Sequence, residues 1–189
     1  AVQHIVIMKK FSRLKNTYCF CLLVAWLLMP LRGTAQINAE QVLRVGQNSL
    51  YFEDYMLAIQ YFNQAINAKP YLAQPYFFRA IAKLNLDDFL GAEEDATAAI
   101  DRNPFIADAY EVRGVARQNR GRFAEAVSDY DSALRLVAKS RGLLFNKALA
   151  QQELNWTDSA MVSFNHLLEE FPNFENGYIT YCEAHHNMA

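Results

Sequence analysis

The sequence is poor in the residues that break a chain or cross-link it. It contains only 7 Gly, 5 Pro and 3 Cys among 189 residues, whereas Phe and Tyr number 13 and 10. Disordered chains have few aromatic residues and much Pro and Ser, so this composition excludes disorder over most of the chain. The shortage of cysteine predicts that packing, rather than disulfide bonds, stabilises the fold.

Motifs of catalysis and metal binding are also lacking. The sequence has no Gly-rich phosphate loop, no paired-Cys metal motif and no His-Glu-x-x-His helix. Cys182, His185 and His186 would share one face of a helix, but a zinc site needs a fourth ligand. We therefore favour a structural role for these three residues. The sequence predicts no catalytic residue, no metal and no cofactor, and the chain is not expected to be an enzyme.

Charge is distributed unevenly along the chain. The formal net charge is −2, but the first 35 residues hold five of the 18 Lys and Arg and no Asp or Glu. From Gln36 onward, 13 basic residues face 20 acidic ones, which gives a net charge of −7. Phosphate binding needs local Lys and Arg, so nucleic acid is not an expected partner.

The first 35 residues have the three parts of a secretory signal peptide. A basic cluster follows Met8, residues 18–29 are apolar, and the small residues 33–35 form a cleavage site before Gln36. We predict that Met8 is the initiator, that residues 1–7 are upstream read-through, and that the mature chain, 36–189, is exported to the periplasm or cell envelope of a bacterium.

An uncleaved signal is the alternative, and it is the only contact with a membrane that the sequence suggests. The 16 uncharged residues between Lys15 and Arg32 are fewer than the roughly 20 that a spanning helix needs, which favours cleavage over a retained anchor.

A 34-residue period organises the chain after the signal. Pro70 and Pro104 are one period apart, and Pro172 lies two periods beyond Pro104. Small residues recur in the same register as three series: Ala58, Ala92, Ala126 and Ala160; Gly46, Ala80, Gly114 and Ala148; and Ala65, Ala99 and Ala133. A shared period of this length indicates structural repeats.

Each repeat is predicted to form two amphipathic helices. In the third repeat, segments 107–119 and 123–137 place apolar residues at steps of three and four, with Gly121 between them. A small residue lets two crossing helices approach closely, and a larger one there would overpack the contact.

This pattern resembles the tetratricopeptide repeat (TPR). The family's large residue early in the first helix is represented by Val42, Tyr76, Tyr110 and Leu144, and its small residue by the Gly46 series. The second-helix aromatic is represented by Phe62, Tyr130 and Phe164, with Ala96 in the second repeat. The family's late first-helix aromatic is replaced by Ser49, Lys83, Arg117 and Gln151.

The resemblance implies an all-α fold, a right-handed α-solenoid of antiparallel helix pairs. Four TPR units are expected at 39–72, 73–106, 107–140 and 141–174, and the first helix of a fifth at 175–189. A terminal helix without a cap exposes its apolar face, so we expect the chain to be a fragment of a longer repeat protein.

In TPR proteins that hold peptides, the first helices line a concave groove. The resemblance places in this groove Leu43, Gln47, Tyr51, Phe77, Ile81, Asn85, Glu111, Val115, Asn119, Phe145, Leu149 and Gln152. Amide groups can hydrogen-bond an extended backbone, while Phe77 and Phe145 offer pockets for side chains. Alternatively, Phe77, Ile81 and Leu149 only pack against neighbouring repeats.

Two charge patterns complete the prediction. TPR domains that bind chaperone tails hold a terminal carboxylate with Lys, Arg and Asn. The corresponding places here carry Leu43, Gln47, Phe78, Asp108 and Val112, so a carboxylate-clamp chaperone tail is not an expected partner. The acidic run Glu93, Glu94 and Asp95 is expected to be a solvated helix face.

Three functions remain open. The leading hypothesis is a non-enzymatic exported scaffold that binds a segment of another protein in its concave groove. The alternative is a targeting or assembly module of a larger envelope protein or enzyme whose catalytic domain lies beyond Ala189. In the third, the fifth first helix pairs with a second copy of the chain.

Overall fold

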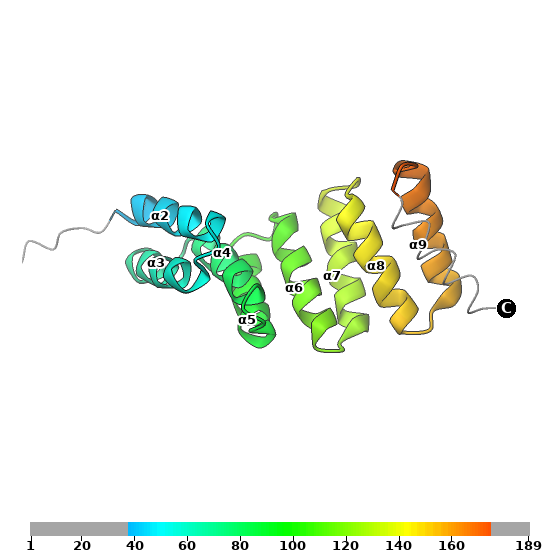
Figure 1. Ribbon diagram of the computed structural model, residues 1–189, viewed down its shortest axis with the longest axis horizontal. Helices are drawn as coiled ribbons and strands as arrows, with labels where there is room; N and C mark the ends of the chain where they lie inside the picture. Colours follow the sequence, from blue (N-terminus) through cyan, green and yellow to red (C-terminus); the bar gives the residue numbers. More distant parts are fainter. Residues whose placement is uncertain (1–37, 175–189) are drawn as a thin grey trace, which may run out of the picture. The chain divides into compact units, whose positions relative to one another are not determined.

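Four pairs of α-helices make up residues 38–174, the part of the chain that the computed structural model describes (Figure 1). The first helices of the pairs are α2 (Ala39–Tyr51), α4 (Ala73–Leu84), α6 (Ala107–Asn119) and α8 (Arg141–Glu153). The second helices are α3 (Tyr55–Ala68), α5 (Phe89–Arg102), α7 (Phe123–Leu136) and α9 (Thr157–Glu170). These described residues contain no strand, and the predicted all-α fold of helix pairs is confirmed.

Several predictions lie outside the described residues. They concern the signal peptide, the fifth first helix, and the group formed by Cys182, His185 and His186. Over residues 38–174, no helix is both long enough and apolar enough to cross a bilayer.

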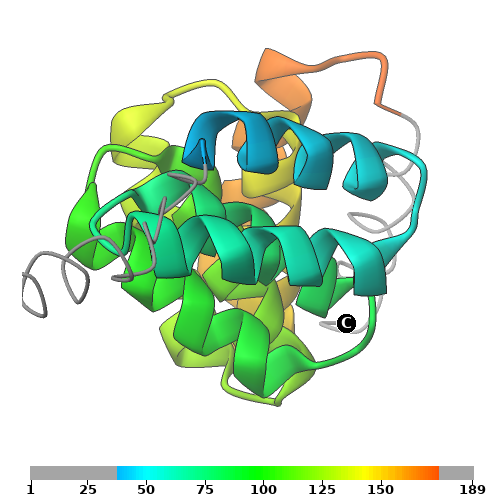
Figure 2. The same cartoon turned by 90° about the vertical axis from the view of Figure 1, so that its left-hand side faces the viewer.

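The period of the sequence sets where the helices begin. The first helices start at Ala39, Ala73, Ala107 and Arg141, so each begins one full period after the last. Every helix packs on the next one along the chain, and α2, α4, α6 and α8 also contact one another in that order. Figure 2 looks at this row of pairs from the side of α2 and α3. Because packing joins neighbouring pairs, the stability of each pair depends on the pairs beside it.

Small residues bring the two helices of a pair close together, as the sequence predicts. A Cβ added at Gly46 would lie 2.6 Å from the Phe62 ring, and one added at Gly114 would lie 2.6 Å from the Tyr130 ring. In the second pair, Ala80 and Ala96 belong to one buried cluster. The aromatic ring is missing in this second pair, whereas in the fourth pair Ala148 and the Phe164 ring share one buried cluster.

The turn inside each pair repeats one backbone conformation. A positive φ occurs once in every period, at Glu53 (61°), Asp87 (58°), Gly121 (73°) and Asn155 (55°). The next residue then bonds back over the helix end, as where the Arg122 N–H donates to the Arg117 carbonyl at 2.9 Å. This is the Schellman arrangement, which favours glycine at the left-handed position. Only the third turn has the favoured residue.

Two substitutions of opposite sign test this account of the turns. Gly121→Ala should lower the free energy of unfolding by about 1 kcal/mol, because a left-handed backbone is costly for any residue with a Cβ. No heavy atom lies within 4 Å of the added Cβ, so the backbone alone supplies the loss. Glu53→Gly should raise the free energy of unfolding by a smaller amount, since glycine also increases the conformational entropy of the unfolded chain. Urea unfolding measures both, and an unchanged Gly121→Ala midpoint would contradict the account.

Candidate functional site

The predicted groove residues lie on four adjacent first helices and differ in exposure. Leu43 is a core residue that exposes only 6% of its surface, whereas Tyr51 exposes 82%. The other members near helix ends, Asn85 and Asn119, are exposed. The remaining members are half-buried: Gln47, Phe77, Ile81, Glu111, Val115, Phe145, Leu149 and Gln152. A partner could therefore contact only the exposed parts of most of these side chains.

The apolar members of the row pack in part against buried clusters of the helix pairs. Phe77 and Ile81 contact the cluster that contains Val112 of the following first helix, α6. Phe145 and Leu149 contact the cluster of the fourth pair. Packing against a neighbouring repeat thus accounts for the buried parts of Phe77 and Ile81, whereas Leu149 packs within its own pair.

The two asparagines bond to their own helices. The Asn85 side-chain N–H donates to the Ile81 carbonyl at 2.9 Å, and Asn119 makes the same bond to Val115 at 2.9 Å. These bonds use the donor group of each amide. The amide oxygen stays available as an acceptor at the C-terminal end of α4 and of α6.

Glu111 connects the third and fourth pairs. A Cβ added at Gly142 would lie 3.3 Å from the Glu111 Oε1 atom, which places this carboxylate beside the first turn of α8. Free backbone N–H groups at a helix N-terminus favour a negative charge there. Burial nevertheless raises the pKa of Glu111 above its ordinary value, and the charge of Asp108 raises it further.

Gln118 and Gln152 occupy equivalent places in the third and fourth pairs, but only Gln118 has a hydrogen-bond partner at its side-chain oxygen within the described residues. The buried Tyr130 hydroxyl donates to Gln118 Oε1 at 2.8 Å. Burial, followed by the charges of Glu111 and Asp129, raises the pKa of Tyr130, so this hydroxyl remains a donor. Gln152 is the equivalent of Gln118 one period later in the chain.

In the fourth pair, Phe164 stands where the third has Tyr130, so it has no hydroxyl to offer Gln152. Within the described residues, Gln152 Oε1 is buried and has no hydrogen-bond partner. An unsatisfied buried acceptor costs roughly 1–3 kcal/mol, and a bound N–H group would remove that cost. The sequence placed Gln152 in the groove but did not identify this missing bond, although the Tyr-to-Phe change is visible in the register of the repeats.

The prediction of a solvated acidic face on α5 is wrong for two of its three residues. Glu93 and Asp95 expose only 8% and 4%, and only Glu94 is exposed. The reason is that α5 packs between α4 and α6, whose basic side chains reach it from both sides. Asp95 pairs with Arg79 and with Lys83, the latter at 2.8 Å.

Glu93 is surrounded by cations from the third pair. Its carboxylate contacts Arg117 at 2.9 Å and Arg122 at 2.6 Å, and it also pairs with Arg120. Burial acts to raise the pKa of Glu93, but the hydrogen bonds and charges of Arg117 and Arg122 outweigh it and hold the pKa below its ordinary value. The carboxylate is therefore charged near neutral pH.

These ion pairs form a ladder that follows the repeat. Arg113 donates to Asp129 at 2.7 Å in its own pair and to the Thr97 hydroxyl at 3.4 Å in the preceding pair. Arg79 bridges the equivalent places, Asp95 and Asn63. We call this set of bridges between second helices the Arg ladder.

The Arg ladder also explains a departure from the TPR pattern. Lys83 and Arg117 stand where the family has a late first-helix aromatic, and each pairs with the aspartate of its own second helix. Arg117 reaches Asp129 at 2.8 Å. In the fourth pair the same two places hold Gln151 and Ser163, which hydrogen-bond at 2.7 Å. Polar bonds thus replace aromatic packing in three of the four pairs.

Metal chemistry finds no support in this part of the chain. Across residues 38–174, no group of three or more His, Cys, Asp and Glu side chains is arranged to hold a metal ion.

Comparisons with known proteins identify the fold. No protein-family model and no curated protein matches the sequence. Among solved structures, a crystal structure of MamA matches with a TM-score of 0.68 and 22% identity, over 70% of this chain and 78% of that one. The TPR domain of Arabidopsis OM64 matches with a TM-score of 0.60 and 27% identity, over 60% of this chain and 94% of that domain.

A third match is the first TPR domain of Spaghetti (RPAP3), solved with the HSP90 peptide SRMEEVD. It has a TM-score of 0.61 and 27% identity, over 62% of this chain and 93% of that domain. The chain is therefore a TPR protein in fold: the class that the sequence pattern resembles is the class that its structure matches.

One substitution tests the account of Gln152. Phe164→Tyr should raise the free energy of unfolding by about 1 kcal/mol, because the new hydroxyl can donate to Gln152 Oε1 as Tyr130 does to Gln118. Thermal or urea unfolding of the purified chain measures it.

The first pair supplies the matched control. Phe62 is equally buried, but Leu50 stands there in place of the glutamine. Phe62→Tyr would bury a hydroxyl beside Leu50 and should destabilise the chain by roughly 1–3 kcal/mol. If Phe164→Tyr and Phe62→Tyr lower the free energy of unfolding to the same extent, the new hydroxyl does not donate to Gln152 Oε1, and the account is contradicted.

Proposed function

We propose that this protein is a non-enzymatic scaffold whose first helices bind a segment of another protein. The observation that carries the proposal is Gln152 Oε1, which is buried, has no hydrogen-bond partner in the described part of the chain, and lies in a row of half-buried apolar side chains on adjacent helices. The matched TPR domains support the same class of function, since one of them was solved with a bound peptide.

The proposed binding mode is an extended segment laid across α4, α6 and α8. Its backbone N–H groups donate to the amide oxygens of the exposed Asn85 and Asn119, and to the buried Gln152 Oε1 once the Gln152 side chain turns outward. Its alternate side chains contact the exposed parts of Phe77 and Phe145. Main-chain hydrogen bonds then give affinity, and the apolar contacts give sequence preference.

The groove differs from one that holds an acidic tail by its terminal carboxylate. None of the five clamp places, Leu43, Gln47, Phe78, Asp108 and Val112, is basic. Leu43 and Val112 are also buried, which leaves them little contact with a partner. We therefore propose a groove partner that is held along its length rather than by its C-terminus.

The location of the protein is part of the proposal. The basic and apolar pattern of residues 1–35 favours export to the periplasm or cell envelope of a bacterium. The acidic array favours a protein partner over nucleic acid in that compartment.

Site-specific photo-crosslinking tests the groove. A benzoylphenylalanine residue at Asn85 or Asn119 should capture the same protein from an extract of the source cell. The matched positions Asn67 and Ser128 are also exposed but lie on second helices, and they should capture it weakly or not at all. Capture of one protein with equal yield from all four positions would place the contact outside the groove.

The purified partner then gives a sharper measurement. Phe164→Tyr should weaken its binding about tenfold, because the tyrosine hydroxyl competes with the partner for Gln152 Oε1. The loss of affinity in a more stable protein separates a role in binding from a defect in folding.

A further inference from the structure

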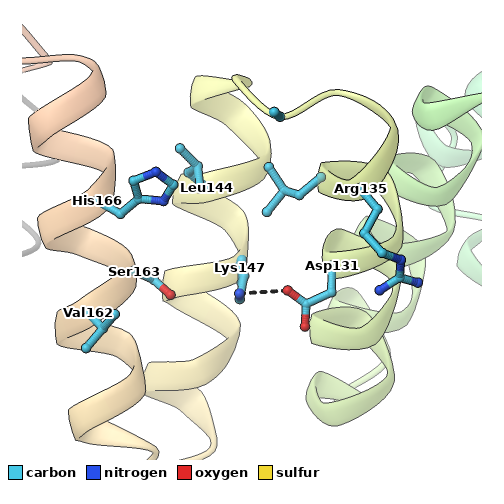
Figure 3. A pocket seen from close by; sticks show the side chains of 9 residues that line it. Asp131, Arg135, Leu144, Lys147, Val162, Ser163 and His166 are labelled. Atoms are coloured by element: carbon cyan, nitrogen blue, oxygen red, sulfur yellow. Dashed lines mark ion pairs between the residues drawn. The ribbon is translucent and has the colours of Figure 1, made fainter.

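A hollow of about 460 Å³ lies between α7, α8 and α9 (Figure 3). Figure 3 shows Ser163 and His166 on α9 at one side, Asp131 on α7 at the other, and Lys147 of α8 between them. Leu144 and Val162 contribute apolar lining. A cavity of this size, with apolar walls and a few polar groups, is of the kind that holds a ligand.

The hollow is distinct from the predicted groove. Its lining includes none of the twelve predicted groove residues. On α8, Lys147 is two positions from both Phe145 and Leu149. Two residues on an α-helix turn about 200° around its axis, so Lys147 lies on the opposite side of α8 from those two.

The Arg ladder explains why the hollow exists. In the third pair, Arg113 is held by the Asp129 carboxylate and lies 5.5 Å from the centre of the Tyr110 ring. In the second pair, Arg79 has the same two neighbours, Asp95 at 2.5 Å and the Tyr76 ring at 5.5 Å.

The fourth pair keeps the cation of the ladder and loses both neighbours. Lys147 stands in the register of Arg113, but Ser163 replaces the aspartate and Leu144 replaces the tyrosine. Both replacements are smaller than the groups that fill this place in the preceding pairs. Both smaller side chains, Leu144 and Ser163, line the hollow.

Lys147 has one ion-pair partner within residues 38–174. Its Nζ atom lies 2.7 Å from Asp131 Oδ1 on α7, and the side chain is 22% exposed. The Ser163 hydroxyl on the other side is already bonded to Gln151. An ammonium group has three donors, so Lys147 retains donors for an acceptor that enters from the α9 side.

We propose that this hollow binds an aliphatic carboxylate, the side chain of a Glu or Asp residue in a partner protein. The carboxylate takes the place that Asp95 and Asp129 fill in the preceding pairs, between Lys147 and α9. It accepts from the Lys147 ammonium beside the His166 ring, while Leu144 and Val162 contact the aliphatic part of the ligand. The site is independent of the groove and of what binds there.

The test uses the full chain and two small probes. N-acetylglutamate methylamide carries the proposed carboxylate, and N-acetylglutamine methylamide has the same shape without the charge. In an NMR titration, the first should produce saturable shifts at the backbone amides of Lys147, Ser163 and His166. Equal affinity for the glutamine probe would overturn the proposal. Butyrate distinguishes a free carboxylic acid from a protein side chain as the ligand. If butyrate binds as tightly as the glutamate probe, the peptide groups of the probe add nothing to the affinity. That result would overturn the assignment to a protein side chain.

Three variants locate the site. Lys147→Met removes the cation and should weaken binding of the glutamate probe at least tenfold, as expected for a charged hydrogen bond. Ser163→Asp restores the carboxylate of the second and third pairs and should weaken it equally by occupying the place. Ser159→Asp adds the same charge at an exposed position of the same helix and should leave the affinity within about twofold.

Each outcome decides the proposal. Unchanged affinity in Lys147→Met overturns it, and so does unchanged affinity in a folded Ser163→Asp. Should Ser163→Asp fail to fold, Lys147→Met compared with Ser159→Asp gives the same decision.

Discussion

The guanidinium group of Arg113 holds three helices in register. It extends from α6, pairs with Asp129 on α7 and reaches Thr97 on α5, so it fixes the second helix of one pair against that of the pair before. The side chains of Arg113 and Asp129 expose only 15% and 3% of their surfaces. A buried charge without a partner is strongly destabilising, so Arg113 depends on Asp129, while Asp129 is shared between Arg113 and Arg117. Arg79 repeats the arrangement one pair earlier.

Both proposed binding sites arise where the fourth pair departs from this internal bonding. Ser163 and Phe164 are consecutive residues of α9, in the register of Asp129 and Tyr130. Within residues 38–174, replacing the aspartate leaves Lys147 with no ion pair to α9, and replacing the tyrosine leaves Gln152 Oε1 without a donor. In the third pair, Arg113 and Gln118 bond to Asp129 and Tyr130. In the fourth pair, we propose that a bound molecule supplies the equivalent bonds to Lys147 and Gln152. Two adjacent positions of α9, at which the fourth repeat differs from the third, thus give rise to one proposed binding site in the groove and one outside it.

The sequence predicted the helix pairs, their starting points and the small residues at their crossings, because all three follow from spacing. The prediction that Glu93 and Asp95 are solvated was wrong, because a run of acidic residues in a sequence does not show whether water or arginine side chains surround the carboxylates. The pairing of Arg79 with Asp95 recurs as that of Arg113 with Asp129, and both residues of the pair repeat with the 34-residue period of the sequence. The half-burial of Phe77 and the near-complete burial of Leu43 depend on how closely neighbouring first helices pack, which periodicity alone does not determine.

The central claim is that the buried ion pairs of the Arg ladder are energetically coupled, as Arg113 on α6 is with Asp129 on α7. A double-mutant cycle of Arg113→Ala and Asp129→Ala, followed by urea unfolding, measures this coupling directly. We expect the two residues to couple by at least about 1.5 kcal/mol, because removing Asp129 leaves the Arg113 guanidinium without its carboxylate, and removing Arg113 takes from the buried Asp129 one of its two cations. A coupling energy below about 0.5 kcal/mol, the scale of an exposed ion pair, would contradict the account.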